Sequence, residues 1–141
     1  MARKEPAWLS TDVLVAVHRK LIAEHGGAQG IRDRGLLESA LVRPATLLHY
    51  GNPNIFEMAA AYAAGIARNH PFVDGNKRAS FIAAYIFLVR NGYEPRMTEA
   101  ETVLIMLKLA TGEVTEPHLA AWLSENTRRQ QRRRLAKPKR R

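Results

Sequence analysis

The residues best equipped for chemistry in this sequence lie together between positions 70 and 78. The segment reads His-Pro-Phe-Val-Asp-Gly-Asn-Lys-Arg, so it combines an imidazole, a carboxylate, an amide and two cations. An imidazole with a pKa near ~6.5 can accept a proton from a hydroxyl at neutral pH. A carboxylate beside phosphate groups is suited to holding Mg²⁺. These residue types therefore point to phosphoryl or nucleotidyl transfer, with His70 as the base.

Two apolar helices are expected to hold this segment in place. Residues 54–69 are rich in alanine and residues 76–90 are apolar on nearly every side, so both helices should be buried. The second helix would begin at Gly75 or Asn76, where backbone N–H groups point outward. Lys77 and Arg78 lie in its first turn, at a mild cost against the positive end of the helix dipole. Phosphate is the usual occupant of such a helix start.

Each of these residues also has an ordinary structural interpretation when it is taken singly. The histidine could be a hydrogen-bonded loop residue, Asp74-Gly75 a simple turn, and the two cations a solvated surface. The density of polar types on one short loop, together with the unfavourable placement of the cations, favours a functional site. Phe72 is expected to anchor the loop in the core, whereas Arg68 is equally well explained as a phosphate ligand or a solvated residue.

The rest of the pattern predicts an all-α, compact bundle of about six helices. The expected helices cover residues 11–24, 36–42, 54–69, 76–90, 98–111 and 115–123. Asn54 with Glu57, and Thr98 with Glu101, have the spacing of capping boxes. Pro44 is expected to close the second helix. A small hairpin is predicted within residues 47–52, ahead of the third helix.

Composition narrows the class of protein. The chain has 141 residues, of which 46% are hydrophobic, so one globular domain is expected. The absence of cysteine excludes disulfides, thiolate nucleophiles and cysteine-based zinc sites. No apolar run approaches the ~20 residues of a membrane span, and no signal peptide is visible. We therefore expect a soluble cytoplasmic protein.

The net charge of +9 is concentrated at one end of the sequence. Residues 128–141 hold nine basic residues and no acidic one, and the 13 other basic residues balance the 13 acidic residues. The predicted division is a folded domain over 1–127 and a disordered basic tail over 128–141. The favoured interpretation of the tail is a solubilising extension. Contact with RNA, DNA or an acidic partner through charge alone is the alternative.

The 70–78 segment resembles the signature of the Fic/Doc superfamily, His-x-Phe-x-Asp/Glu-Gly/Ala-Asn followed by Gly or Lys and then Arg. The matching positions are His70, Phe72, Asp74, Gly75, Asn76 and Arg78. Lys77 is typical of Doc (death-on-curing) toxins, where Fic adenylyltransferases have Gly. Phe81 occupies the position of a second Arg in the Fic version. The resemblance covers roughly residues 8–125 and leaves the basic tail outside.

The resemblance implies a compact Fic/Doc-like helical domain and a toxin of a toxin–antitoxin pair. Such a toxin is a kinase that uses ATP and Mg²⁺ to phosphorylate a threonine of elongation factor Tu, which arrests translation. His70 would deprotonate the target hydroxyl, and Asp74 would help to hold Mg²⁺. The residues implied to bind the nucleotide phosphates are Gly75, Asn76, Lys77 and Arg78.

The resemblance also makes predictions about docking and regulation. Residues 45–54 stand where the family has a flap, a hairpin that captures the target by strand addition. The candidate flap residues are Leu47, Leu48 and Tyr50. The inhibitory pattern of many Fic proteins, Ser/Thr-x-x-x-Glu-Gly/Asn, is broken because Glu125-Asn126 is preceded by alanine at position 121. Inhibition is therefore expected from a separate Phd-like antitoxin that lays an amphipathic segment in a groove.

Other functions stay open at this point. An adenylyltransferase or another nucleotidyltransferase could be built on the same fold, although Lys77 and Phe81 argue against it. A non-catalytic nucleic-acid-binding module acting through the tail belongs to a different class and leaves the 70–78 segment unexplained. A folded protein that has lost its activity is the third alternative.

Overall fold

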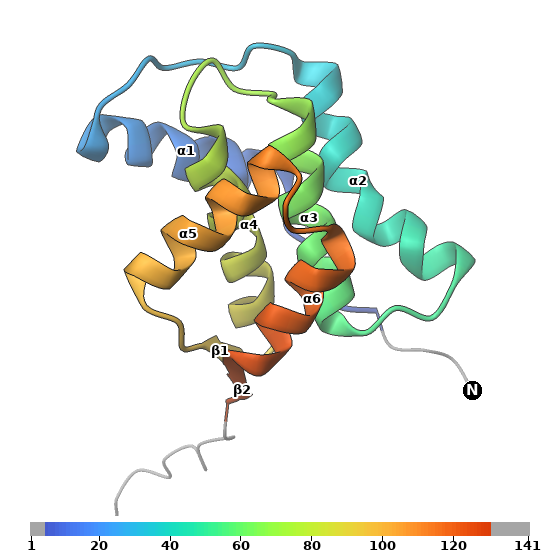
Figure 1. Cartoon of the computed structure of the whole chain (residues 1–141). Coiled ribbons are helices and arrows are strands. Elements are labelled where there is room, and N and C mark those ends of the chain that lie inside the picture. The colour runs from blue at the N-terminus through green and yellow to red at the C-terminus, as the bar shows by residue number, and fades with distance from the viewer. Residues whose placement is uncertain (1–4, 131–141) are drawn as a thin grey trace, which may run out of the picture.

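A computed structural model describes residues 5–130, which form six α-helices and one small two-stranded sheet (Figure 1). The helices are α1 (Thr11–His25), α2 (Arg34–Tyr50), α3 (Ile55–Asn69), α4 (Asn76–Arg90), α5 (Glu99–Thr111) and α6 (Glu116–Glu125). The strands are β1 (Tyr93–Pro95) and β2 (Thr127–Arg129), which pair antiparallel. The all-α fold class is thereby confirmed. Within the described residues, no helix is both long enough and apolar enough to cross a lipid bilayer.

Helix α3 is the centre of the fold, and α2, α4 and α6 pack around it (Figure 1). Every residue of α3 from Met58 to Ile66 is buried. Its small residues let the neighbouring helices come very close: a Cβ added to Gly65 would lie 3.1 Å from the Cβ of Ala40 on α2. The alanine-rich sequence thus produces a helix that can be approached from several sides.

Local capping signals set most helix boundaries as predicted. The side chain of Ser10 accepts the N–H of Val13 at the start of α1. Both predicted capping boxes form, at Asn54 for α3 and at Thr98 for α5. These interactions satisfy N–H groups that have no partner within the helix, so they fix where the helix begins.

The N-terminal segment is tied to the core before α1 begins. The N–H of Leu9 donates to the hydroxyl of Tyr62 on α3, with 3.0 Å between the two atoms. Burial raises the pKa of Tyr62 above its ordinary value of 10.0, with the hydrogen bond from Leu9 acting in the opposite direction. The segment that precedes α1 is therefore bound to α3, the central helix.

The second helix is longer than the sequence pattern predicts. Asp33 caps α2, which then continues through Pro44 to Tyr50 instead of ending near residue 42. A proline inside a helix removes one hydrogen bond and crowds the preceding turn. Pro44 is buried on the face that α2 turns to α3, together with Leu37 and Ala40, and this packing offsets the local cost.

The hairpin predicted within residues 47–52 is consequently wrong. Residues 45–50 are helical, so Leu47, Leu48 and Tyr50 lie on α2 rather than on a flap. The small sheet lies elsewhere, where β1 pairs with β2 through Tyr93 and Arg129, Glu94 and Arg128, and Pro95 and Thr127. A helical backbone has its hydrogen bonds satisfied internally, so this part of α2 offers no edge for strand addition.

The pairing of β1 with β2 also changes the expected domain boundary. Arg128 and Arg129, which the sequence analysis assigned to the tail, are strand residues. The N–H of Gln130 then donates to the carbonyl oxygen of Gly92 (2.8 Å). The folded part therefore reaches residue 130, and the rest of the predicted tail, residues 131–141, lies outside the described residues.

Candidate active site

The loop that joins α3 to α4 begins at a residue with unusual backbone geometry. His70 is the C-cap of α3 and has φ of 47°, in the left-handed region. Among non-glycine residues between 5 and 130, it alone has a positive φ. This conformation costs on the order of 1 kcal/mol for a residue with a Cβ, so the surrounding contacts must hold it. The residue is exposed.

The side chain of Asn76 forms two hydrogen bonds to the backbone of this loop. The N–H of Phe72 donates to Asn76 Oδ1, and Asn76 Nδ2 donates to the carbonyl oxygen of Phe72, both at 2.9 Å. Since Asn76 is the first residue of α4, this pair ties the backbone of Phe72, two residues after His70, to the start of α4. The side chain of Asn76 therefore acts as a clamp on the backbone, a role that the sequence analysis did not assign to it.

Phe72 anchors the loop in the core, as predicted. Its ring is buried and stacks on His18 of α1, with 3.8 Å between the ring centroids and 9° between the planes. His18 Nε2 also donates to the carbonyl oxygen of Asp74 (2.8 Å). The sequence analysis missed His18; its spacing of four residues from both Leu14 and Ile22 was the available signal that it belongs to the buried stripe of α1.

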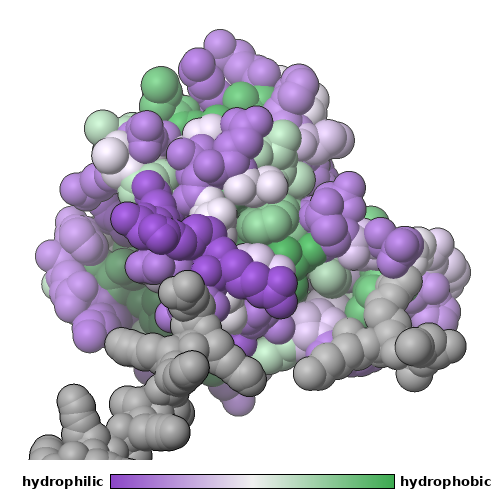
Figure 2. Space-filling model, turned by 90° about the horizontal axis from the view of Figure 1, so that it is seen from below, coloured by the Kyte–Doolittle hydropathy of each residue, from purple (hydrophilic) through white to green (hydrophobic). Residues whose placement is uncertain are grey.

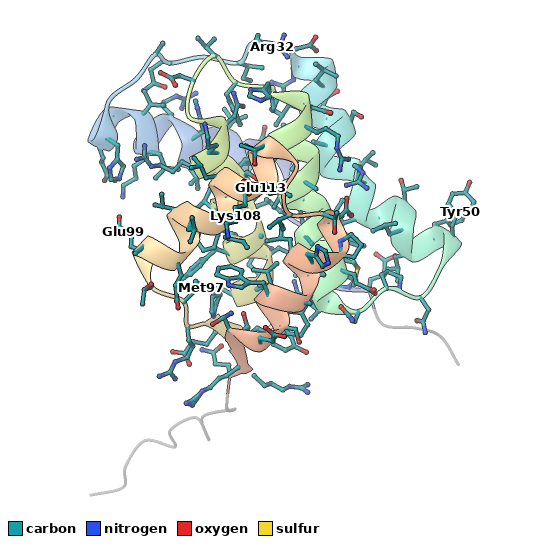
Figure 3. The ribbon with its side chains drawn as sticks, viewed as in Figure 1. Arg32, Tyr50, Met97, Glu99, Lys108 and Glu113 are labelled. Carbon is teal, nitrogen blue, oxygen red and sulfur yellow. The ribbon has the colours of Figure 1, made fainter. Side chains whose placement is uncertain are left out.

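A second segment supports the loop from the other side. Residues 30–33 run alongside residues 71–73: the N–H groups of Arg32 and Asp33 donate to the carbonyl oxygen of Pro71, and that of Val73 donates to Gly30. The guanidinium of Arg32 donates to the carbonyl oxygens of His70 (2.7 Å) and Asn69 (2.9 Å). A cation at these carbonyls is favourable because they form the negative end of α3. Arg32 lies at this end of the molecule in Figure 3, and it is the second positioning residue that the sequence analysis missed.

The N-terminus of α4 is left without a side-chain cap. Its N-cap is Gly75, with φ of 75°, and its first turn holds no acidic residue. Each of the five other helices in residues 5–130 begins with a capping side chain, from Ser10, Asp33, Asn54, Thr98 and Thr115. Lys77 and Arg78 are exposed, and neither forms an ion pair with another described residue. The first turn of α4 thus combines N–H groups without a side-chain cap, the positive end of the helix dipole and two exposed cations, a combination that favours an anion.

Asp74 faces the turn that follows α1. Its Oδ2 accepts the N–H of Ala28 (3.2 Å), and its Oδ1 accepts the N–H of Gly75 (2.8 Å). A Cβ on Gly27 would come within 2.8 Å of Oδ2, so only glycine fits there. Each carboxylate oxygen keeps a lone pair for a further ligand.

The loop between α3 and α4 offers one carboxylate, that of Asp74, to a metal ion. In the part of the chain that the structure describes, no three His, Cys, Asp or Glu residues are grouped as metal ligands. A single carboxylate suits Mg²⁺ that arrives with a triphosphate and keeps water and phosphate as its other ligands. The single carboxylate of Asp74 therefore fits a Mg²⁺ ion that is carried by a nucleotide.

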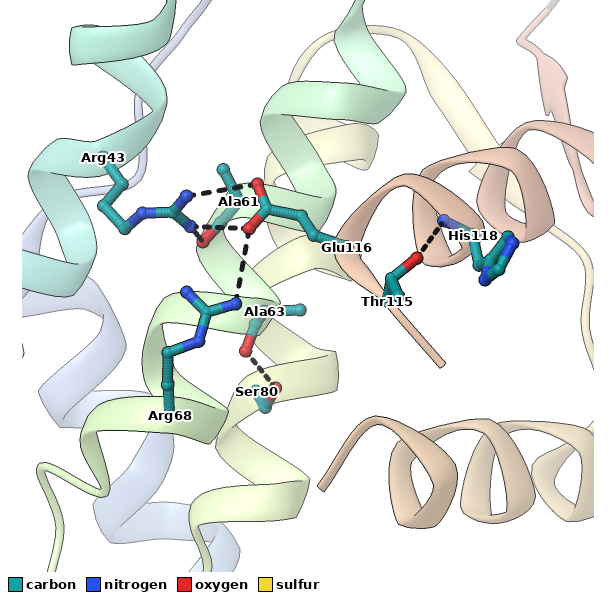
Figure 4. Close-up of polar contacts among 8 residues, drawn as sticks. All are labelled: Arg43, Ala61, Ala63, Arg68, Ser80, Thr115, Glu116 and His118. Carbon is teal, nitrogen blue, oxygen red and sulfur yellow. Dashed lines mark hydrogen bonds and ion pairs between the residues drawn. The ribbon is translucent and has the colours of Figure 1, made fainter. Parts of the chain in front are cut away.

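Arg68 is engaged by an ion pair outside the loop. Its guanidinium lies 3.8 Å from Glu116 of α6, and Arg43 of α2 lies 3.0 Å from the same carboxylate (Figure 4). Arg43 also donates to the carbonyl oxygen of Ala61. The Arg68 side chain is 61% exposed, so this pair contributes little to stability and leaves the guanidinium able to take another anion.

A cavity opens beside Arg68, where α3 approaches the connection between α5 and α6. Its volume is about 560 Å³, within the usual range for small-molecule sites. Ala64 and Ala67 of α3 line one wall, and residues 109–112 and 114–117 line the other. The sequence analysis did not anticipate this cavity because its two walls come from distant parts of the chain.

The predicted flap residues are not part of this arrangement. Leu47 and Leu48 are partly buried on α2, whereas Tyr50 is 81% exposed at the last turn of that helix. Tyr50 and Arg32 lie at opposite ends of α2 in Figure 3. A rise of 1.5 Å per residue separates the two ends of α2 by roughly 24 Å. The structure therefore brings together residues 70–78, His18 and Arg32, and it leaves the flap candidates apart.

Comparisons with known proteins agree with the sequence resemblance. The model of the Fic/DOC family matches residues 8–88, which include the whole 70–78 segment. The chain is 33% identical over 113 residues to "Protein kinase doc" of Escherichia phage P1, covering 79% of this chain and 89% of that protein. It is 44% identical over 72 residues to "Toxin Doc" of Mycolicibacterium smegmatis, covering 49% of this chain and 55% of that protein.

Proposed function

This chain belongs to the Fic/DOC family and resembles its Doc-type toxins, and on this premise we propose that it transfers the γ-phosphate of ATP to a hydroxyl group of a protein. The observation that carries the proposal is the uncapped, cationic start of α4, which a short loop joins to His70, the C-cap of α3 whose carbonyl oxygen Arg32 binds. A polyphosphate satisfies the free amide groups there and places its reacting end next to a base.

The proposed reaction uses the geometry as follows. His70 accepts the proton of the target hydroxyl, whose oxygen then attacks the γ-phosphorus of ATP. The bond from that phosphorus to the oxygen bridging the β- and γ-phosphates breaks, and ADP leaves with the bonding electron pair. Lys77, Arg78 and the amide groups at the start of α4 stabilise the negative charge that spreads over the phosphate oxygens. Mg²⁺ bound by Asp74 and the nucleotide would neutralise further phosphate charge.

Two features support γ-phosphate transfer over AMP transfer. Lys77 stands where the adenylyltransferase signature has glycine. Phe81 stands where that signature has a second arginine, and its ring is partly buried 5.9 Å from the ring of Tyr85. A phenylalanine cannot bind a phosphate, so this position lacks a contact that AMP transfer uses.

The cavity beside Arg68 offers a place for the base and ribose of the nucleotide. It adjoins the C-terminal turn of α3, from which the 70–75 loop departs. Its walls combine apolar side chains such as Leu109 with polar groups of Thr111 and Thr115. This mixture suits a nucleoside, which stacks through its base and hydrogen-bonds through its ribose.

The finer parts of the proposal concern the target and the partner. We propose a threonine of elongation factor Tu as the acceptor, as the resemblance to Doc toxins implies, so that the protein arrests translation in the cytoplasm. We also propose that a Phd-like antitoxin inhibits it. Exposed apolar side chains on two helices support the second point, because an amphipathic helix docks through such side chains. Exposed apolar side chains are present on α4, at Tyr85 and Val89, and on α5, at Val103, Leu104 and Leu107.

The decisive experiment supplies ATP labelled at either the α- or the γ-phosphate to a translation extract containing the whole protein. We expect γ-label, and not α-label, on one protein of the size of elongation factor Tu. His70→Ala should reduce the labelling rate by about 10²–10⁴-fold, because it removes the base. His49→Ala is the matched control, since it removes an exposed histidine from the far end of α2.

The possible outcomes test the kinase assignment, the role of His70, the target and the toxin role separately. Transfer of α-label would replace the kinase assignment with AMP transfer. Equal γ-labelling by the wild type and by His70→Ala would remove the histidine from the mechanism. Labelling of a different protein would leave the kinase assignment intact and overturn the elongation factor as the target. The toxin assignment would fail if the protein, expressed alone, did not slow growth.

A further inference from the structure

One carboxylate on the wall of the cavity is shared by two arginines. Glu116 is the first residue of α6, and its side chain is 20% exposed. Arg43 of α2 meets this carboxylate through two nitrogens, with 3.0 Å from Nη1 to Oε1 and 3.3 Å from Nη2 to Oε2. Arg68 of α3 approaches Oε1 at 3.8 Å (Figure 4). The three side chains therefore join α2, α3 and α6 beside the cavity.

The two arginines are held to different degrees. Arg43 also donates from Nη1 to the carbonyl oxygen of Ala61 (3.1 Å), and its side chain is 32% exposed. Two parallel contacts between a guanidinium and a carboxylate form a strong, well-oriented pair. Arg68 has one longer contact with the carboxylate and a side chain that is 61% exposed. Arg43 is therefore the fixed partner of Glu116, whereas Arg68 can leave it.

The charges of this cluster leave one cation in excess. Arg43 and Glu116 neutralise each other, so the positive charge of Arg68 remains. Among the described residues that line the cavity, Arg68 is the only cation and Glu116 the only acid. When Arg68 turns to an anion, Glu116 keeps its partner in Arg43. Without Arg43, the same movement would leave a partly buried carboxylate unpaired, which is costly.

We propose that Arg43 is a positioning residue, which neutralises Glu116 and thereby frees Arg68 to bind the phosphates of the nucleotide. The proposal rests on the nucleotide site proposed above and names the group that keeps one of its cations available. Arg43 is not among the described residues that line the cavity, so it acts through Glu116 and not by touching the ligand. An ion pair that only tied α6 to α2 would have no such effect on phosphate binding.

The test breaks the cluster at Arg43. Arg43→Met removes the charge and keeps an apolar side chain in place of the stem of the arginine. Glu116 then competes with the ligand for Arg68. The affinity of the whole protein for ATP with Mg²⁺, measured by isothermal titration calorimetry, should fall about fivefold, the equivalent of one exposed ion pair. The KM for ATP should rise by the same factor while kcat stays unchanged, because the lost contact is uniform binding.

A second substitution distinguishes positioning from a structural role. Adding Glu116→Gln to Arg43→Met removes the competing carboxylate, so the ATP affinity should return to within about twofold of the wild type. A purely structural tie predicts no such recovery, because the double variant has lost both members of the pair. Arg68→Ala should weaken ATP binding about tenfold. Adding Arg43→Met to Arg68→Ala should have no further effect, since the residue through which Arg43 acts is gone.

The matched control breaks an ion pair of similar length elsewhere. Arg96 lies 4.0 Å from Glu94 of β1, and both side chains are about half exposed. Strand β1 lies at the opposite end of the molecule from the loop between α3 and α4 (Figure 1), and Figure 2 shows a band of strongly hydrophilic residues across this end. Arg96→Met should change the ATP affinity less than about twofold, because solvent screens a charge at that distance.

Adenosine and inorganic tripolyphosphate serve as further probes. Adenosine has no phosphate, so Arg43→Met should leave its affinity unchanged; a loss as large as that for ATP would mean that the cavity has changed shape and would overturn the proposal. Failure of Glu116→Gln to restore ATP binding would also overturn it. If Arg43→Met does not fold by circular dichroism, Arg43→Gln takes its place, since its amide can still donate to the carbonyl oxygen of Ala61.

The same probes separate this proposal from the proposed function. ATP binding that Arg43→Met leaves unchanged would refute the role of Arg43 and keep the nucleotide site. A wild-type protein that binds tripolyphosphate but not ATP would refute the nucleotide, and weaker tripolyphosphate binding by Arg43→Met would then still support the role of Arg43. A wild-type protein that binds neither ligand would refute both proposals.

Discussion

Helices α4 and α5 begin in opposite ways. At the start of α5, the N–H of Glu101 donates to Thr98 Oγ1 (3.1 Å) and the N–H of Thr98 donates to Glu101 Oε1 (2.8 Å). Glu99 adds negative charge to the same turn, at the positive end of the helix dipole. The start of α4 has glycine as its N-cap and cations in its first turn. Side chains of the protein thus cap the first N–H groups of α5, whereas the first N–H groups of α4 have no side-chain cap.

This difference indicates what each helix start is for. A side-chain cap stabilises a helix by about 1 kcal/mol. Cations at the positive end of the helix dipole destabilise it by a few tenths of a kcal/mol more. The open start of α4 is nevertheless closely packed, since a Cβ at Gly75 would lie 3.0 Å from Ile22 Cδ1 and would force that side chain to move. A closely packed helix start that lacks a side-chain cap is expected where a ligand accepts the hydrogen bonds of the first N–H groups.

Replacing Arg78 should produce the largest effect and tests the comparison directly. We expect Arg78→Ala to lower the rate of phosphate transfer by about 10²–10³-fold, because it removes charge from the site where negative charge develops. Its melting temperature should stay the same or rise slightly, since a cation leaves the positive end of a helix. The mirror-image control is Lys108→Ala, which removes a favourable cation from the last turn of α5. It should keep full activity; a stability loss in Arg78→Ala larger than that in Lys108→Ala would contradict this account.

Replacing Asn76 should combine a loss of activity with a loss of stability. Asn76→Ala leaves the N–H and the carbonyl oxygen of Phe72 without their partner, at an expected cost of about 1–3 kcal/mol. Because the clamp also positions His70, turnover should fall by about 10²-fold even at saturating ATP. Thermal melting and separate measurements of kcat and KM check the two effects. If the substitution raised only the KM for ATP, Asn76 would be a phosphate ligand instead of a clamp.

Two glycines with similar backbone geometry give the next comparison. Gly75 and Gly112 have φ of 75° and 85°, but a Cβ would meet Ile22 at the first and nothing within 4 Å at the second. Alanine at either position carries the left-handed penalty of about 1–2 kcal/mol. Gly75→Ala should lose roughly a further 1 kcal/mol through overpacking and should also lose activity. Equal melting temperatures for the two variants would show that the start of α4 can relax around a methyl group.

The sequence predicts those parts of this fold that are encoded locally. The capping boxes at Asn54 and Thr98 and the contiguous 70–78 segment each depend on residues a few positions apart. The contacts that position the site join distant residues, as between His18 and Asp74, 56 positions apart, and between Arg32 and His70, 38 positions apart. No short pattern encodes such pairs.

The error at α2 has the same origin. Pro44 carries a strong local signal for a helix end, and the sequence analysis followed it. The observed helix continues because Pro44 is buried against α3, a tertiary contact that outweighs the local preference. The predicted flap depended on that false helix end, so the two predictions failed together.

The smallest expected effect concerns the start of α5, and it decides whether the comparison between the two helices holds. Thr98→Ala removes the cap and half of the capping box, so the free energy of unfolding should fall by about 1 kcal/mol. In a domain of this size, that lowers the melting temperature by roughly 2–5 °C. Activity should not change, because Thr98 begins α5 whereas the cavity lies at the other end of this helix. A threefold or larger loss of activity, with the protein still folded, would mean that α5 transmits the state of its first turn to the nucleotide site. In that case the start of α5 would contribute to activity, as the start of α4 is proposed to do. The cap at Thr98 would then serve more than the stability of the helix.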